Sequence, residues 1–149
     1  MLSRRAALGL LAATPALAAL PAFSQTAPVF SENAVALRGA DPVAYFTEGA
    51  NRIGSARNAA TWNGATWHFT TAANRDAFAA EPEAYAPQYG GYCAFAMSRG
   101  YIAPTVPEAW TIYENRLYLN FSLSVRRQWA RDIPGNIALA DQVWPGILA

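Results

Sequence analysis

The chain has 149 residues, of which 53% are hydrophobic and 14% are charged, so it can bury one sizeable core and does not resemble a disordered polymer. Its eleven basic residues are all arginine, and its formal net charge is only +1. Nucleic acid and anionic membrane are excluded as principal partners, because both are bound through clustered positive charge that this sequence lacks.

The first 24 residues have the pattern of a twin-arginine signal peptide. Arg4-Arg5 precedes an Ala/Leu-rich run, and Ala22-Phe23-Ser24 fits a small-x-small cleavage site. The mature chain is expected to begin at Gln25, with cleavage after Ala18 as the alternative. An uncleaved membrane anchor is less favoured, because two prolines interrupt the run and a span needs about 20 strongly apolar residues.

The predicted organisation is a signal peptide over residues 1–24 followed by one domain over residues 25–149. Export by this route carries a folded chain to the bacterial periplasm, and no stable membrane span is expected after cleavage. Cys93 is the only cysteine, so it cannot form an internal disulfide in that oxidising compartment. It is expected to be buried and inert, bound to a metal, or paired with another molecule. The sequence leaves the oligomeric state open.

Asn63-Gly64 lies between Thr/Trp-rich runs and predicts a β-hairpin with strands over residues 60–62 and 65–70. Side chains alternate along a strand, so Trp67 and Phe69 should share one face and His68 should lie on the other. A helix is expected to follow over AANRDAFAA, capped by Thr71 and ending near Pro82. Asp41-Pro42 upstream is interpreted as the start of a turn.

A second hairpin is predicted at the Glu114-Asn115 turn, between Trp110–Ile112 and Leu117–Phe121. A helix should begin at Ser122 or Ser124 and end at Pro134-Gly135, because its apolar residues recur at helical spacing. A short final helix capped by Asn136 completes the chain. The expected fold class is α+β: a small single domain in which two β-hairpins pack with about three helices.

Three segments carry a resemblance to a known family: DPVAYF from Asp41, the run from Thr61 to Met97 that contains APQYGGYCA, and the run from Pro107 to Pro145 that contains LYLN. Together they resemble the exported, twin-arginine branch of the YHS domain family over nearly the whole mature chain. The resemblance implies a compact α+β domain. Relatives in the broader family lie beside heavy-metal-transporting ATPases and other metal proteins and are often assigned a metal-binding role.

The sequence departs from the metal-handling branch of that family. The cysteine that usually follows the Asp-Pro-Val unit is replaced by Ala44, and the cysteine that follows the aromatic strand has no counterpart at Thr70-Thr71. Two of the thiolates expected from the resemblance are therefore missing.

The remaining soft or borderline metal donors are Cys93, Met97 and His68. They are too few for a structural zinc site, which takes four ligands, or for a blue-copper centre, which takes two histidines and a cysteine. A low-coordinate copper ion, chiefly Cu(I), held by Cys93 with Met97 and His68 or shared between two subunits, is the metal cofactor that fits this set. Cys93 and Met97 are four residues apart and would share one face of a helix.

Two other functions stay open at this point. In the first, the chain is a non-enzymatic domain that binds a small ligand or a protein, and Cys93 is a small residue of the core. The tryptophans and Tyr89 would then build the core or line an aromatic pocket. In the second, Cys93 and His68 form a thiol-dependent redox pair. No hydrolase, phosphate-loop, zinc-protease or dinucleotide motif occurs, so an enzyme is the less favoured reading.

Overall fold

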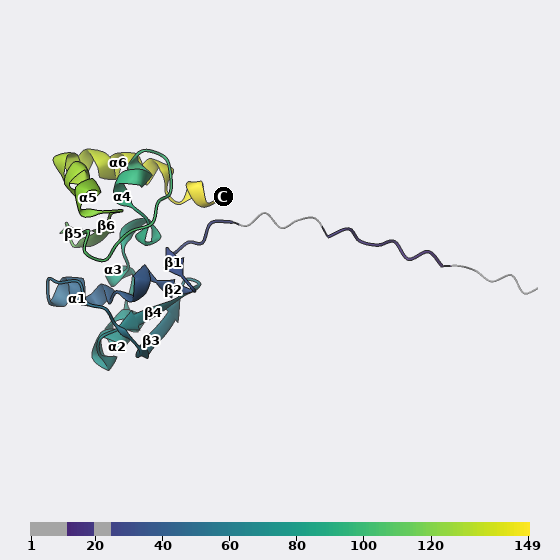
Figure 1. Cartoon of the computed structure of the whole chain (residues 1–149), viewed down its shortest axis with the longest axis horizontal. Helices are drawn as coiled ribbons and strands as arrows, with labels where there is room; N and C mark the ends of the chain where they lie inside the picture. The colour runs from purple at the N-terminus through teal and green to yellow at the C-terminus, as the bar shows by residue number, and fades with distance from the viewer. Residues whose placement is uncertain (1–11, 20–24) are drawn as a thin grey trace, which may run out of the picture.

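A computed structural model describes residues 12–19 and 25–149 of the chain. The predicted Arg4-Arg5 pair and the cleavage site at residues 22–24 lie outside the described residues. Residues 12–19 have no secondary structure and lie away from the folded body (Figure 1).

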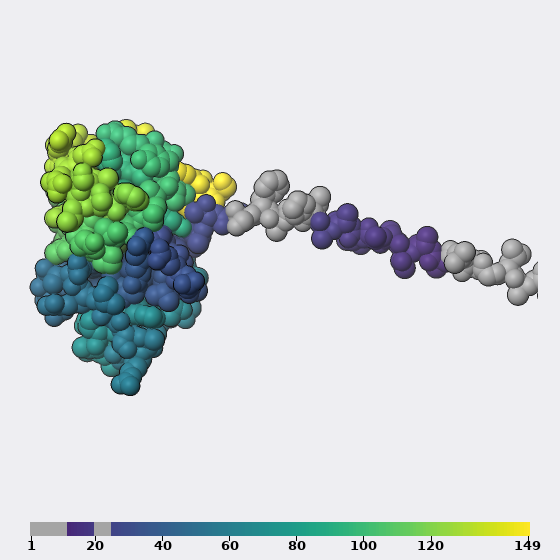
Figure 2. All heavy atoms as spheres, viewed as in Figure 1, coloured from purple at the N-terminus to yellow at the C-terminus, as the bar shows by residue number. Residues whose placement is uncertain are grey.

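The folded body confirms the α+β class and consists of two halves stacked on each other (Figures 1 and 2). The N-terminal half, blue to teal in the figures, contains a sheet and three helices. These elements are β1 (Ser31–Glu32), β2 (Val35–Ala36), α1 (Pro42–Thr47), β3 (Ser55–Trp62), β4 (Ala65–Phe69), α2 (Ala72–Ala80) and α3 (Pro82–Tyr85).

The C-terminal half, green to yellow in Figure 1, packs three helices on a two-stranded ribbon. Its elements are α4 (Ala94–Ser98), β5 (Trp110–Tyr113), β6 (Arg116–Leu119), α5 (Leu123–Trp129) and α6 (Ile133–Val143). The helices α1, α3 and α4 are short, with four to six residues each, and add to the three helices expected from the sequence.

Both predicted hairpins are present. β3 and β4 pair antiparallel with Trp62 opposite Ala65 across the Asn63-Gly64 turn, and β5 pairs with β6 across the Glu114-Asn115 turn. Burial alternates along β4 as predicted, with Trp67 buried and His68 half-buried. The sheet order is β1-β2-β4-β3, and the short strand β2 pairs parallel to β4, which the sequence pattern did not indicate.

The predicted boundary at Pro134-Gly135 is wrong. Helix α5, capped by the Ser122 hydroxyl as expected, already ends at Trp129, and α6 begins at Ile133. Proline is tolerated in the first turn of a helix because its missing N–H would have no partner there. Asn136 is therefore a residue inside α6 rather than its cap, and the cap is Asp132, whose carboxylate accepts the Gly135 N–H at 3.0 Å.

Strand β6 separates two hydrophobic clusters. Leu117 and Leu119 are fully buried in the cluster of the N-terminal half, together with Trp67, Phe69 and other residues of the sheet and α1. Tyr118, on the opposite face of the strand, is buried in the second cluster with residues of α4, α5 and α6. Because side chains alternate along β6, this one strand packs against both halves and joins them.

Asp41 joins three elements of the N-terminal half. One carboxylate oxygen accepts the N–H groups of Val43 and Ala44 at 2.9 and 3.3 Å, which caps α1. The other oxygen accepts the Thr70 N–H and hydroxyl and the Asn74 side-chain amide at 2.8 to 2.9 Å. The Asp41-Pro42 pair therefore starts a helix, not only a turn, because its side chain satisfies the first free N–H groups.

Candidate functional site

Cys93 is buried, with 1% of its surface exposed, and lies at the N-cap of α4. Its sulfur accepts the N–H groups of Ala96 at 3.5 Å and Phe121 at 3.3 Å. The thiol also lies 3.5 Å from the Asn120 side-chain oxygen, to which it can donate. The sulfur therefore has protein partners on three sides, and the thiol links the start of α4 to the end of β6.

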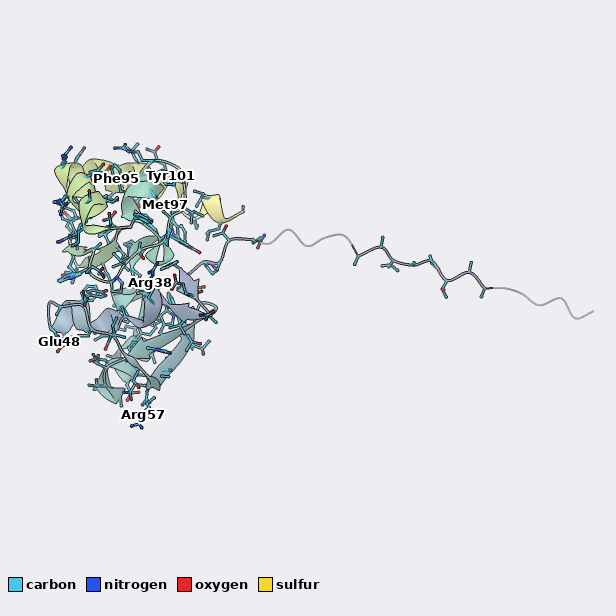
Figure 3. All side chains as sticks on the ribbon, in the orientation of Figure 1. Arg38, Glu48, Arg57, Phe95, Met97 and Tyr101 are labelled. Carbon is cyan, nitrogen blue, oxygen red and sulfur yellow. The ribbon has the colours of Figure 1, made fainter. Side chains whose placement is uncertain are left out.

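Met97 lies one helical turn after Cys93, and its N–H donates to the Cys93 carbonyl at 2.9 Å. Its side chain is completely buried in the second hydrophobic cluster. Figure 3 shows it in the C-terminal half, on the same helix as Phe95. In this position Met97 fills the core between α4 and its neighbours.

His68 lies in the other half of the molecule, on β4, opposite Ala59 of β3. The structure thus brings Cys93 and Met97 together on α4 but does not bring His68 to them. Within residues 12–19 and 25–149, no group of three His, Cys, Asp or Glu side chains could hold a metal ion. The Cys93 sulfur already has three protein partners, and His68 lies in the other half, so the predicted set of Cys93, Met97 and His68 is not assembled in this arrangement.

The Gly90-Gly91 pair before Cys93 makes a tight left-handed turn, with φ of 64° and 86°. A Cβ atom at Gly90 would overlap the Pro28 carbonyl oxygen, so this position needs glycine for both its conformation and its close contact. This turn carries the chain from the boundary between the halves to the buried Cys93.

Residues of both halves line a cleft with a volume of about 540 Å³. The tips of the two hairpins reach it, with Asn63 from one turn and Asn115 from the other. Four aromatic residues contribute to the lining, three of which are tryptophans: Trp62, Trp67, Tyr89 and Trp144. Its size is within the range of small-molecule sites, which is about 300 to 1,000 Å³.

The polar side chains of the cleft are amides, carboxylates and one guanidinium, contributed by Asn63, Glu83, Gln88, Glu114, Asn115 and Arg116. All are exposed except Gln88, which is half-buried. The ion pairs found in the described part of the chain are Arg38–Glu32, Arg52–Glu48 and Arg75–Asp76. None of them includes Glu83, Glu114 or Arg116. The charged groups of the cleft are therefore not neutralised by an ion pair within the described part of the chain.

Tyr89 forms the inner wall of the cleft with a side chain that is only 4% exposed. Its hydroxyl donates to the Asp141 carboxylate of α6 at 3.0 Å, which fixes the ring. Burial raises the pKa of the Tyr89 phenol well above its ordinary value, and the hydrogen bond and negative charge of Asp141 raise it further. The phenol is thus held neutral and faces the cleft as a rigid apolar surface.

The buried tyrosines predict a loss of stability in alkali. Burial raises the pKa of Tyr45, Tyr89, Tyr92 and Tyr118 above the ordinary value of 10. Above pH 10 the unfolded chain therefore binds fewer protons than the folded chain. Stability from these groups is complete below about pH 10 and is lost as the pH rises beyond it.

Urea unfolding at pH 8, 10 and 11 measures this effect, and the free energy of unfolding should fall between pH 10 and 11. Tyr89→Phe should make the decline shallower, because it removes one of the titrating groups. An unfolding free energy that stays constant up to pH 11 would contradict the tyrosine assignment.

Searches of family models, curated proteins and solved structures found no match to this chain. Among the described residues, none of the helices has the length and apolar character needed to span a membrane.

The sequence predicted that the tryptophans and Tyr89 lie either in the core or in an aromatic pocket. Trp67 and Tyr89 do both, Trp62 and Trp144 line the cleft while half-buried, and Trp110 and Trp129 do not line it. The sequence did not identify the polar side chains of the cleft. A signal for two of them was present in the hairpin turns, because Asn63 and Asn115, with φ of 50° and 61°, are the turn residues that the sequence indicated.

Proposed function

We propose that this protein is a binding domain for a small polar organic molecule, and that its site is the cleft between the two halves. The observation that carries the proposal is the lining of the cleft, where four aromatic side chains meet two carboxylates and a guanidinium that have no ion-pair partner among the described residues. Concave sites with apolar walls and a few convergent polar groups are the usual form of small-ligand sites.

The rigidity of the cleft walls supports this proposal. Tyr89 is fixed by Asp141, and the Trp67 indole N–H donates to the Trp62 carbonyl at 3.0 Å. Trp144 packs against Tyr89 with a distance of 6.3 Å between ring centroids. A site whose walls are already ordered loses little conformational entropy when a ligand binds.

A thermal-shift screen tests the proposal with a library of sugars, amino acids, nucleosides and carboxylic acids. A compound at 100 times its Kd should stabilise the native protein by about 2.7 kcal/mol and raise its Tm. The variant R116A should lose this shift, whereas R127A, which removes an exposed arginine of α5 outside the cleft, should keep it. The proposal fails if no compound raises the Tm, or if both variants respond like the wild-type protein.

We further propose that the protein is an exported, YHS-like periplasmic domain. The supports are the Arg4-Arg5 pair with the cleavage pattern at Ala22-Phe23-Ser24, and the APQYGGYCA and LYLN segments. Expression in a bacterium with an intact twin-arginine pathway should yield a periplasmic chain that begins near Gln25. Replacement of Arg4-Arg5 by Lys-Lys should leave the full-length precursor in the cytoplasm, and unchanged export of this variant would contradict the assignment.

Copper handling through Cys93 is the second candidate function. One observation favours it, the location of Cys93 and Met97 on one short helix. The enclosed sulfur and the distant His68 argue against it. If it holds, the mature chain takes up about one equivalent of Cu(I) in competition with a chelator, and C93S abolishes the uptake. Equal uptake by C93S and the wild-type protein, or none by either, rejects it.

A further inference from the structure

We infer that the ligand of the cleft is a saccharide, that is, a ring with several neighbouring hydroxyl groups. This inference rests on the proposed binding function of the cleft and adds the chemical class of the ligand. It depends on three observations: the type of polar group in the lining, the balance of charge, and the exposure of two tryptophans.

The polar lining consists entirely of planar groups. Two carboxylates accept hydrogen bonds, the Arg116 guanidinium donates them, and the three amides do both. Each of these groups has two polar atoms side by side, which can bind two adjacent hydroxyl groups of a sugar ring at once. No serine or threonine is among the described lining residues, so side-chain hydroxyl groups of these types do not contribute to the site.

The balance of charge disfavours anionic ligands of this size. Glu83 and Glu114 oppose one Arg116, so the lining carries a formal charge of −1. A phosphate or a dicarboxylate would be repelled, because anion sites concentrate arginine or helix N-termini. A neutral molecule with many hydroxyl groups uses the acceptors and the donors together without a charge of its own.

Two tryptophans supply the apolar contact that a sugar ring needs. Trp62 and Trp144 are half-buried, and each packs its inner side on other aromatic rings. Both tryptophans also line the cleft. The C–H face of a pyranose is flat and weakly positive, so it stacks on the negative face of an indole, while the hydroxyl groups at its rim reach the planar polar groups.

The experiment titrates the mature chain with maltose, cellobiose and N,N′-diacetylchitobiose, observed by saturation-transfer NMR and tryptophan fluorescence. Sorbitol is the control ligand, because it has similar hydroxyl groups but no ring face. We expect at least one disaccharide to bind and sorbitol not to bind. The variant W144L should weaken binding about tenfold, the loss of one stacked ring.

Two further variants separate binding from folding. Y101L removes an aromatic side chain that is 54% exposed outside the cleft and should leave the Kd unchanged. E114A changes an exposed turn residue without touching the core, and it should also weaken binding if W144L proves unstable. If no saccharide binds while other compounds of the thermal-shift library bind at the cleft, the saccharide assignment is overturned and the binding function stands. If nothing binds, both are overturned.

Discussion

The variant D41N is expected to lower the free energy of unfolding by about 3–5 kcal/mol. Asp41 is 0% exposed and accepts five hydrogen bonds from four residues, which lie in α1, directly after β4 and in α2. An asparagine keeps one oxygen for the N–H groups of α1. Its amide nitrogen would face the donors of Thr70 and Asn74, which are partly buried and would lose their carboxylate acceptor.

Urea denaturation of D41N and of D76N at neutral pH measures this difference. Asp76 is the matched control, because its side chain is 70% exposed and pairs only with the neighbouring Arg75. D76N should change the unfolding free energy by less than about 0.5 kcal/mol. A loss below about 1 kcal/mol in D41N would show that the five hydrogen bonds do not hold the N-terminal half together.

The variant N120A is expected to cost about 2–4 kcal/mol. Asn120 is 0% exposed at the end of β6, and its oxygen accepts the Phe95 N–H at 3.0 Å and faces the Cys93 thiol. Removal of the amide leaves the Phe95 N–H without its acceptor and creates a cavity beside α4. The helix α4 has only five residues, so it depends on this contact rather than on its own length.

Urea denaturation and the rate of Cys93 modification by a thiol reagent measure the effect of N120A. Cys93 is buried, so its modification reports the opening of the structure, and it should be faster in N120A than in the wild-type protein. Q128A, which removes an exposed amide from α5, is the matched control and should change neither quantity. Equal modification rates in N120A and Q128A would contradict the role of Asn120.

The elements that the sequence predicted well are those specified by local chemistry. Asn63-Gly64 and Glu114-Asn115 form turns in which all four residues have positive φ, a conformation that Asn and Gly adopt readily, and both hairpins follow from them. Thr71 and Ser122 cap α2 and α5 with their hydroxyl groups, as their positions before helical patterns indicated. Such signals act within a few residues and do not depend on the rest of the fold.

The elements that the sequence did not predict depend on contacts made elsewhere in the chain. The strand β2 has two residues and exists because Val35 pairs with Thr66 of β4, some thirty residues later. The four-residue helix α3 is likewise too short to be stable alone. Pro134 indicated a helix end in the sequence but lies in the first turn of α6, since proline is common both just after a helix and in its first turn.

The candidate site likewise combines features that local sequence indicates with features that depend on distant parts of the chain. Cys93 was conspicuous in the sequence as the only thiol, yet its neighbours Asn120 and Phe121 lie in a distant segment and could not be inferred from spacing. The cleft requires two hairpin tips and the C-terminal Trp144 to meet, which is a property of the tertiary structure. The sequence indicated aromatic residues that could line a pocket, but it did not indicate the polar side chains that line the cleft with them.

The most direct test of the cleft as the binding site is an ¹H–¹⁵N NMR titration that follows the five tryptophan indole signals. Trp62, Trp67 and Trp144 line the cleft, whereas Trp110 and Trp129 do not, so the protein carries its own controls. With the compound that stabilises the protein most, we predict shifts for the first three indoles and none for the other two. Shifts confined to Trp110 and Trp129, or no shift at saturating compound, would contradict the account.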